Sequence, residues 1–292
     1  MSKMPKVKEV LEMKKPMQAQ LRQACPNMVT FLALAFGVSS LNFSFWGRWE
    51  LAVLSLILAA VFDGLDGRVA RMLNTSSKFG AELDSLSDFV SFGVAPAFLL
   101  YQWTMDQAAR ASIISSNSMQ LTSVISDNSL QIADAVGARW VFVLLLSMCC
   151  ALRLARFNTM LEEEPMPSYW THFFVGLPAP GGAIVALTPL TLWLQFHWPF
   201  LRNPVFVSCF MTLSAFLMAS RIPTLSLKHL HVSEGIRVYL SFFMLIVVAL
   251  TLVYPWIVLG IISVGYLFTL PVGILFFLKF KKQALKTGKP SN

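Results

Sequence analysis

Charged residues are scarce in this chain: Asp, Glu, Lys and Arg make up 13% of its 292 residues, whereas apolar residues make up 56%. A soluble domain of this length cannot bury that much apolar surface. Cysteine is also scarce, and the four cysteines have no metal-ligand spacing, which favours packing roles over a disulfide framework. The four histidines form no ligand pattern either. The composition therefore predicts an integral membrane protein.

The apolar residues gather in about eight segments, each close to the roughly 20 residues that cross a bilayer as a helix. We expect spans at Met28–Phe45, Leu51–Phe62 running on to Arg71, Gly80–Trp103, Trp140–Phe157, Phe173–Phe196, Pro204–Ser220, Val238–Tyr254 and Trp256–Leu278. The predicted fold class is all-α, a polytopic membrane helical bundle. The stretch Thr104–Val136 is rich in Ser, Asn and Gln, and we expect an external loop there.

The net charge of +8 would fit a nucleic-acid partner, but the placement of the basic residues argues against one. With the N-terminus inside, the outside loops hold only Arg48, Arg110, Arg139 and Arg202, and nearly all other Lys and Arg residues fall inside. Cytoplasmic loops of membrane proteins carry this excess of positive charge. We therefore expect a protein integral to the cytoplasmic (inner) membrane, with both termini on the cytoplasmic side and no nucleic-acid partner.

The polar leader before the first span has a loose helical spacing of apolar residues over Lys3–Gln23, interrupted by Pro16. This pattern favours an interfacial amphipathic helix whose basic residues lie near anionic lipid head groups. A disordered cytoplasmic leader is the alternative.

Four aspartates surround the junction of the second and third spans. Asp63 and Asp66 are three residues apart at the end of one span, so they share a helix face. Asp84 and Asp88 are four residues apart at the start of the next span and share a face as well. A short loop joins the two helices, so we expect all four carboxylates to converge near the cytoplasmic membrane surface.

Carboxylates gathered in this way repel one another and resist burial unless a cation offsets them. One or two hard divalent cations, Mg²⁺ or Mn²⁺, meet that need and complete their ligand shells with phosphate oxygens. Gly64 and Gly67 would let phosphates approach the backbone, and Arg71 supplies donors for phosphate oxygens. Helix packing is the alternative role for Gly64. An ion-coupled transporter that uses the aspartates as its ion site is the alternative function.

The full string around these residues reads D-x-x-D-G-x-x-A-R-x8-G-x-x-x-D-x-x-x-D. It resembles, without a departure, the signature of the CDP-alcohol phosphotransferase family, whose members join a CDP-linked donor to an alcohol and release CMP. The resemblance implies that two metal ions bridge the diphosphate and that Asp88 is the base for the acceptor hydroxyl. It implies that the metal ligands are Asp63, Asp66, Asp84 and Asp88, and that the CDP site is formed by Asn27, Thr30, Gly67, Ala70, Arg71, Ser77 and Gly80.

Three further segments narrow the acceptor alcohol. They are Arg153–Thr159, Phe174–Pro180 and Ser220–Lys228, and each is similar to a segment typical of bacterial phosphatidylserine synthases of the membrane-integral kind. The resemblance implies CDP-diacylglycerol and L-serine as substrates and a homodimer in the membrane lipid. Glycerol phosphate, inositol phosphate or choline as the acceptor is the nearest alternative.

Serine is a zwitterion, so its site needs a receptor for a carboxylate and another for an ammonium group. Arg153 or Arg156 would hold the carboxylate in a bidentate fork, and Asn158 or a backbone carbonyl would receive the ammonium. The alternative is that both arginines only mark the membrane boundary.

These inferences divide the chain into four parts. Residues 1–24 form the leader, 25–228 the catalytic transmembrane domain, 229–280 two additional transmembrane helices, and 281–292 a basic cytoplasmic tail.

Overall fold

The structure is a computed structural model that describes residues 7–73, 75, 77–105, 127–162, 173–220, 223–225, 239, 242, 246–247, 249–251 and 253–269. Residues 106–126 of the expected external loop, about half of the seventh predicted span, the end of the eighth and the basic tail lie outside these residues.

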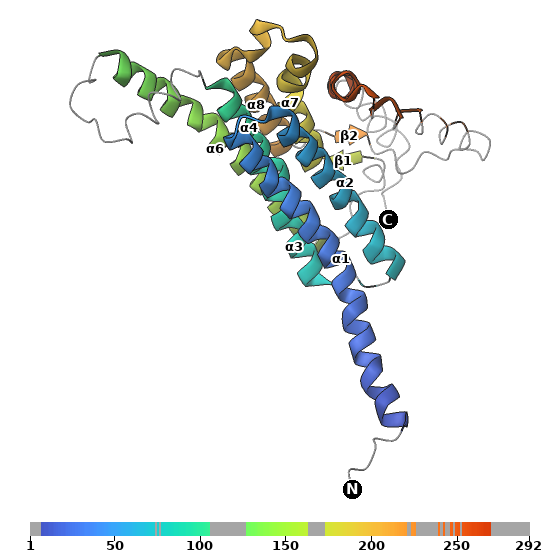
Figure 1. The fold of residues 1–292 in the computed structure, drawn as a ribbon. Helices are drawn as coiled ribbons and strands as arrows, with labels where there is room; N and C mark the ends of the chain where they lie inside the picture. Colours follow the sequence, from blue (N-terminus) through green and yellow to red (C-terminus); the bar gives the residue numbers. More distant parts are fainter. Residues whose placement is uncertain are drawn as a thin grey trace, which may run out of the picture.

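The described residues confirm the all-α prediction. The main helices are α1 (Val7–Phe45), α2 (Trp49–Leu73), α3 (Lys78–Asp88), α4 (Ala95–Thr104), α6 (Asp127–Glu162), α7 (Ala179–Phe196) and α8 (Pro204–Ala219) (Figure 1). Four stretches are long and apolar enough to cross a membrane: Ala24–Phe45, Lys78–Thr104, Gly137–Thr159 and Ala179–Phe196. Two shorter apolar helices are α8 and Pro255–Thr269. The chain is thus a membrane protein, and the number of eight spans stays a prediction.

Two helices begin earlier than the sequence led us to expect. Helix α1 runs without a break through Pro16, so the leader from Val7 onward and the first span are one helix, which extends beyond the bundle (Figure 1). Its position at the membrane interface stays a prediction. Helix α6 begins at Asp127, so the loop expected to reach Val136 is wrong in its last ten residues. Asp127 and the two polar residues after it are typical of helix starts, which explains the earlier boundary.

The third span is one continuous helix with a π-helical turn, η1 (Phe89–Val94), between α3 and α4. Such turns are rare and occur frequently at functional sites. Gly93 in this turn lies against Cys150 of α6, and Gly37 of α1 lies against Ser91. A side chain at either glycine would collide with its neighbour, so both glycines allow the helices to approach the turn closely.

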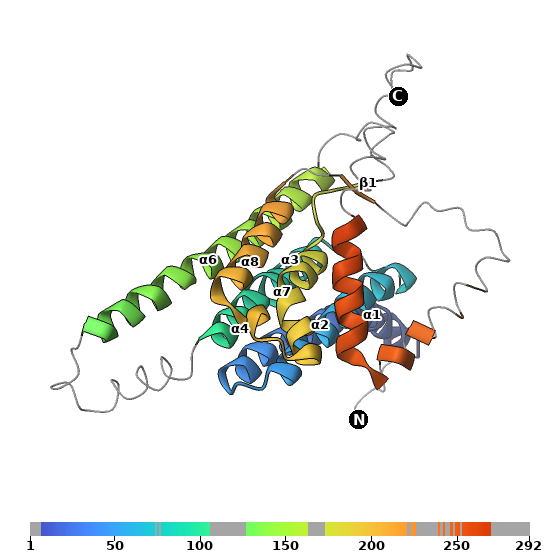
Figure 2. The ribbon, with the colours of Figure 1, turned by 90° about the horizontal axis from the view of Figure 1, so that it is seen from above.

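The helices pack around a core that includes Phe92, Trp103, Leu146, Leu190 and Met218, each at most 2% exposed. Helix α1 packs along α2, and α6 crosses α8 and η1 (Figure 2). The 3₁₀ turn η3 (Pro199–Arg202) connects α7 to α8.

A two-stranded antiparallel ribbon joins the start of α7 to the end of α8. Strand β1 (Phe173–Val175) pairs with β2 (Pro223–Leu225), with Phe173 opposite Leu225. The fifth span therefore begins at Ala179 and not at Phe173, because Gly176 has a φ of 77° and Pro178 precedes the helix. An L side chain rarely adopts that φ, so glycine suits this turn.

Arginines expected outside lie together at one end of the bundle. Arg139 Nη1 donates to the carbonyl of Thr104 (3.2 Å), and Arg202 Nε donates to the carbonyl of Trp103 (3.0 Å). Both carbonyls belong to the C-terminal end of the third span, whereas the aspartates lie near its start. Arg139 and Arg202 therefore lie at the end of the third span away from Asp84 and Asp88, and the orientation in the membrane stays a prediction.

Candidate active site

The turn between α2 and α3 is fixed by local hydrogen bonds. Ser77 is the N-cap of α3, and its Oγ accepts the N–H of Gly80 at 3.0 Å. The N–H of Thr75 donates to the carbonyl of Ala70 at the end of α2, also at 3.0 Å. These bonds cap the start of α3 and close the end of α2, which leaves the short connection between them little freedom. The end of α2 and the start of α3, which carry the aspartates, are thereby held beside each other.

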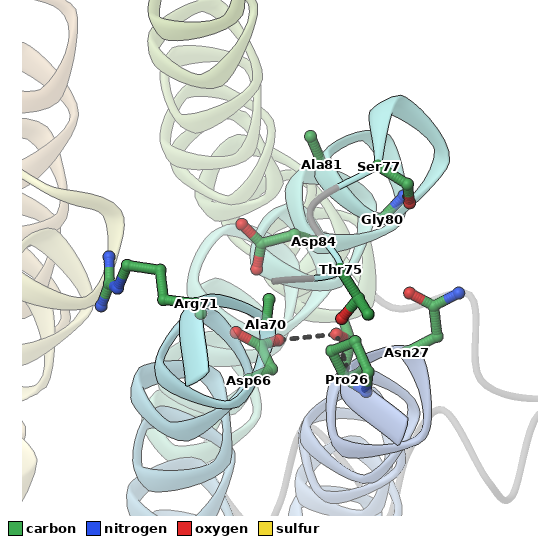
Figure 3. Close-up of a pocket in the computed structure, with 12 residues that line it drawn as sticks. Pro26, Asn27, Asp66, Ala70, Arg71, Thr75, Ser77, Gly80, Ala81 and Asp84 are labelled. Atoms are coloured by element: carbon green, nitrogen blue, oxygen red, sulfur yellow. Dashed lines mark hydrogen bonds between the residues drawn. The ribbon is translucent and has the colours of Figure 1, made fainter. Parts of the chain in front are cut away.

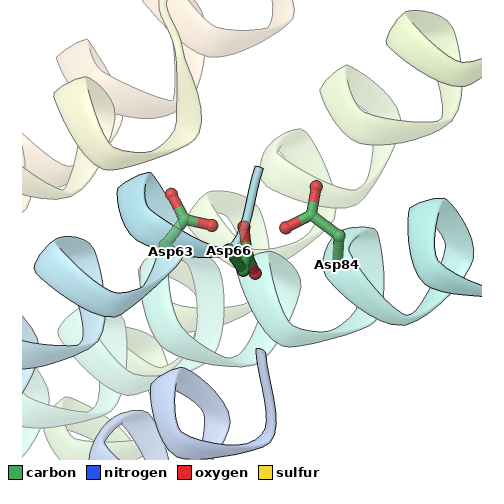
Figure 4. A group of neighbouring side chains, drawn as sticks. All are labelled: Asp63, Asp66 and Asp84. Carbon is green, nitrogen blue, oxygen red and sulfur yellow. The ribbon is translucent and has the colours of Figure 1, made fainter. Parts of the chain in front are cut away.

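Three of the four predicted carboxylates form one group. Oxygen atoms of Asp63, Asp66 and Asp84 all lie within 4.8 Å of one another. Figure 4 shows Asp63 and Asp66 on one helix and Asp84 on the next, with the carboxylates turned toward the space between them. Asp88 lies one turn beyond Asp84 on the same helix, and Asp63 is among its charged neighbours. The expected convergence of carboxylates is therefore present: three form one group, and Asp88 lies beside it.

The surroundings of this acidic cluster do not neutralise it. Among the described residues, no Lys or Arg forms an ion pair with any of the four aspartates, and no described donor reaches the buried Oδ1 of Asp88. Buried charge without a partner is strongly unfavourable. A group of carboxylate oxygens at this spacing can hold a divalent cation, which would remove that cost. The donor set therefore fits a hard metal ion.

Thr30 holds one member of the cluster in place. Its Oγ1 donates to Oδ2 of Asp66 at 2.6 Å, and both residues are buried, at 4% and 6% exposure. Ser87 of α3 in turn donates to the carbonyl of Thr30 at 3.4 Å. Helices α1, α2 and α3 are thereby joined at the cluster. The sequence led us to expect Thr30 at the nucleotide, and the structure also gives it a direct contact with Asp66.

A pocket of about 530 Å³ adjoins the cluster (Figure 3). Its lining contains every residue that the signature led us to expect at CDP, together with two aspartates: Asn27, Thr30, Gly67, Ala70, Arg71, Ser77, Gly80, Asp66 and Asp84. In Figure 3, Arg71 extends to one side of the pocket and Asn27 lies on the other. Residues of α1, α2 and α3 therefore form one continuous surface, although α1 is distant in sequence and only α2 and α3 are joined by a short turn.

The pocket lining also includes Pro26, Thr75 and Ala81, which were not among the residues expected at CDP. Thr75 lies in the eight-residue spacer of the signature, where the pattern carries no information. Its Oγ1 is buried without a hydrogen-bond partner among the described residues, so it can serve a ligand. A β-carbon at Gly67 would have no described atom within 4 Å, and the same holds for Gly64. The described residues thus give Gly64 no packing contact, and Gly67 leaves the pocket wall open.

Of the three residues expected at serine, Arg153 has Asp88 and Asp63 as charged neighbours. It is partly buried on α6 and interacts electrostatically with Asp88 and, more weakly, with Asp63. Its Nε is buried and has no hydrogen-bond partner among the described residues. The guanidinium carbon lies 5.9 Å from the centre of the Phe157 ring, a cation–π distance that restrains the side chain.

The other two residues make contacts between helices. Arg156 Nη1 donates to the carbonyl of Ala219 at the end of α8, at 2.9 Å. Asn158 Nδ2 donates to Oγ of Ser85 on α3, at 3.0 Å. Both contacts hold α6 in position beside the site.

Comparison with known proteins identifies the family of this chain. Residues 23–214 match the CDP-alcohol phosphatidyltransferase family. The chain is 34% identical over 252 residues to the CDP-diacylglycerol–serine O-phosphatidyltransferase of Mycobacterium leprae, covering 86% of this chain and 75% of that protein. It is 29% identical over 229 residues to the protein of the same name from Helicobacter pylori, covering 78% of this chain and 81% of the relative. The family match includes the acidic cluster and every residue that lines the pocket.

Proposed function

Because the chain belongs to the CDP-alcohol phosphatidyltransferase family, we propose that it transfers the phosphatidyl group of CDP-diacylglycerol to L-serine, giving phosphatidylserine and CMP. The names of its relatives support the two substrates. One observation carries the proposal: all the residues expected at CDP line a single pocket, which also contains Asp66 and Asp84 of the acidic cluster. That arrangement suits a nucleotide diphosphate, whose uncharged part needs a pocket and whose charged part needs cations.

The donor would bind with its cytidine part in the pocket and its diphosphate beside Asp66 and Asp84. The pocket volume of about 530 Å³ lies within the range of small-molecule sites. Arg71 supplies planar donors for phosphate oxygens, and Gly67 lets the diphosphate approach the backbone. The acyl chains would stay in the bilayer.

We assign two divalent metal ions, Mg²⁺ or Mn²⁺, to Asp63, Asp66, Asp84 and Asp88. Bound metal ions would neutralise the charge that grows on the diphosphate oxygens during transfer. Thr30 would orient Asp66 through its 2.6 Å hydrogen bond, as the hydrogen-bond partners of metal ligands do.

Asp88 would act as the base of the reaction. The serine hydroxyl oxygen attacks the β-phosphorus of the donor while its proton passes to the Asp88 carboxylate. The bond between that phosphorus and the CMP oxygen breaks, and CMP leaves with the electron pair. Arg153, whose Nε has no described partner, would hold the serine carboxylate on the same side as Asp88. For Arg156 and Asn158 we propose that they hold α6 in place.

We also propose a homodimer in the cytoplasmic membrane with the site on the cytoplasmic side. The distribution of Lys and Arg supports this orientation. Serine and a CTP-derived donor are both available on that side. Labelling of single introduced cysteines in intact and opened vesicles would test the orientation.

The function is tested by CMP release from purified protein in detergent, with CDP-diacylglycerol and Mn²⁺ or Mg²⁺. L-serine, glycerol 3-phosphate, inositol phosphate and choline are offered separately. We expect release with serine, loss of release with EDTA, and loss in Asp63→Asn. Glu50→Gln is the matched control, because Glu50 is an exposed acidic residue at the other end of α2, and it should behave as wild type. Release with another alcohol in place of serine would contradict the acceptor, and metal-independent release would contradict the metal site.

A further inference from the structure

The helix Pro255–Thr269 lies beyond the family match, which ends at residue 214. It carries no sequence motif that connects it with the reaction. Figure 2 shows this helix beside α7. Gly260 of the C-terminal helix lies against Leu192, and Gly181 of α7 lies against Tyr266. The two contacts fix the depth and the rotation of the C-terminal helix on α7, because each depends on a residue without a side chain.

The second contact fixes the position of a phenol hydroxyl at the start of α7. A β-carbon at position 181 would lie 2.7 Å from Oη of Tyr266 and 3.0 Å from its ring, so a side chain there would displace the phenol. Tyr266 also packs against the buried core. Its hydroxyl has no hydrogen-bond partner among the described residues, although the ring is held in place.

Tyr266 and Arg153 are electrostatic neighbours, and Arg153 is also a neighbour of Asp88. Arg153 forms no ion pair with a described residue, and its Nε is buried without a partner. A partly buried guanidinium with unused donors requires an anion. The described residues supply the donors of Arg153 and Tyr266 on one side and the carboxylate of Asp88 on the other. An acceptor that carries both an anionic group and a hydroxyl matches this arrangement.

We propose that Tyr266 determines acceptor specificity, its hydroxyl forming with the Arg153 guanidinium the receptor for the carboxylate of the acceptor. This inference rests on the proposed transfer to serine, whose hydroxyl would then face Asp88. The C-terminal helix is therefore part of the active site. An amino alcohol without a carboxylate would leave both donors unused, so the enzyme would select against it.

The test compares serine with 2-aminoethanol as acceptor in wild type, Tyr266→Phe and Tyr254→Phe. Tyr254 is the matched control, because it immediately precedes the same helix and is 55% exposed. Loss of a hydrogen bond to a charged group should raise the KM for serine about tenfold in Tyr266→Phe. The KM for CDP-diacylglycerol and the rate with 2-aminoethanol should stay unchanged, so the preference for serine falls about tenfold. A merely structural role would change all of these quantities together.

Gly181→Ala provides a second variant, because it displaces the phenol without removing it, and it should shift the preference in the same direction. Serine binding can also be measured without turnover, from the rise in melting temperature that serine causes. In Tyr266→Phe the same rise should require about tenfold more serine. An unchanged serine preference and an unchanged melting response in Tyr266→Phe would overturn the proposal. If the wild type instead uses glycerol phosphate, the proposed acceptor is wrong. Tyr266→Phe must then still weaken that anionic acceptor, and failure to do so would refute the receptor as well.

Discussion

Replacing Thr30 by valine tests whether the hydrogen bond to Asp66 matters for the metal site. Valine keeps the shape of threonine and removes only the hydroxyl, so the packing of α1 on α2 is preserved. The lost bond is short, at 2.6 Å, it joins two residues less than 10% exposed, and its acceptor is a carboxylate. A bond of this kind contributes about 1.5–3 kcal/mol. At about 1.4 kcal/mol per factor of ten, the expected loss is roughly ten- to hundredfold.

The loss should fall on metal affinity, because Asp66 is a proposed ligand and Thr30 is its orienting partner. The assay is a Mn²⁺ titration of CMP release at saturating CDP-diacylglycerol and serine. In Thr30→Val the Mn²⁺ concentration at half-maximal rate should rise by roughly ten- to hundredfold. Thr30→Ser keeps the hydroxyl and should stay close to wild type.

Ser39→Ala is the matched control on the same helix. The Ser39 hydroxyl donates to the carbonyl of Ala35 at 2.7 Å on an exposed face, so its removal should leave the Mn²⁺ titration unchanged. A Thr30→Val enzyme with the metal dependence of the wild type would refute the orienting role. So would a lower maximal rate without a shift of the metal titration.

Two further substitutions separate the pocket from its supports. In Gly80→Ala the new β-carbon would lie 3.2 Å from Oδ1 of Asn27, so the KM for CDP-diacylglycerol should rise roughly tenfold. Gly137→Ala is the control: its β-carbon has no described atom within 4 Å, so this KM should not change. In Arg156→Gln the bond to Ala219 is lost, so the melting temperature should fall by about 2–4 °C with the serine KM unchanged. A tenfold rise in serine KM at unchanged melting temperature would instead place Arg156 in the acceptor site.

The sequence was sufficient to predict the pocket and most of the acidic cluster. Helical periodicity puts residues three or four apart on one face, and a short connection makes two helices antiparallel neighbours. Asp63, Asp66 and Asp84 meet for these two reasons alone. The family resemblance added Asn27 and Thr30 of α1, since no local rule connects Asn27 with Gly80.

The contacts that depend on packing between distant helices were not predictable in the same way. The bond from Thr30 to Asp66 depends on the rotation of α1 against α2, which spacing does not determine. The contact of Arg156 with Ala219 depends on where α8 ends. Tyr266 lies in a helix that carries no motif, and only the close approach at Gly181 brings it to Arg153.

The early start of α6 was missed for another reason. A stretch rich in Ser, Asn and Gln predicts a loop, whereas Asp127 and its polar neighbours form a normal helix start. The ribbon of β1 and β2 was missed because three-residue strands carry no periodic signal in an apolar chain.

The most direct test of the proposed reaction is to follow labelled L-serine into lipid. Purified protein in detergent would be given CDP-diacylglycerol, Mn²⁺ and labelled serine, and the label in the lipid extract would be measured beside the CMP released. The proposed reaction predicts one labelled lipid for each CMP in the wild type and neither product in Asp88→Asn. CMP release without labelled lipid would contradict transfer to serine, and equal labelling by Asp88→Asn would contradict the assignment of the base.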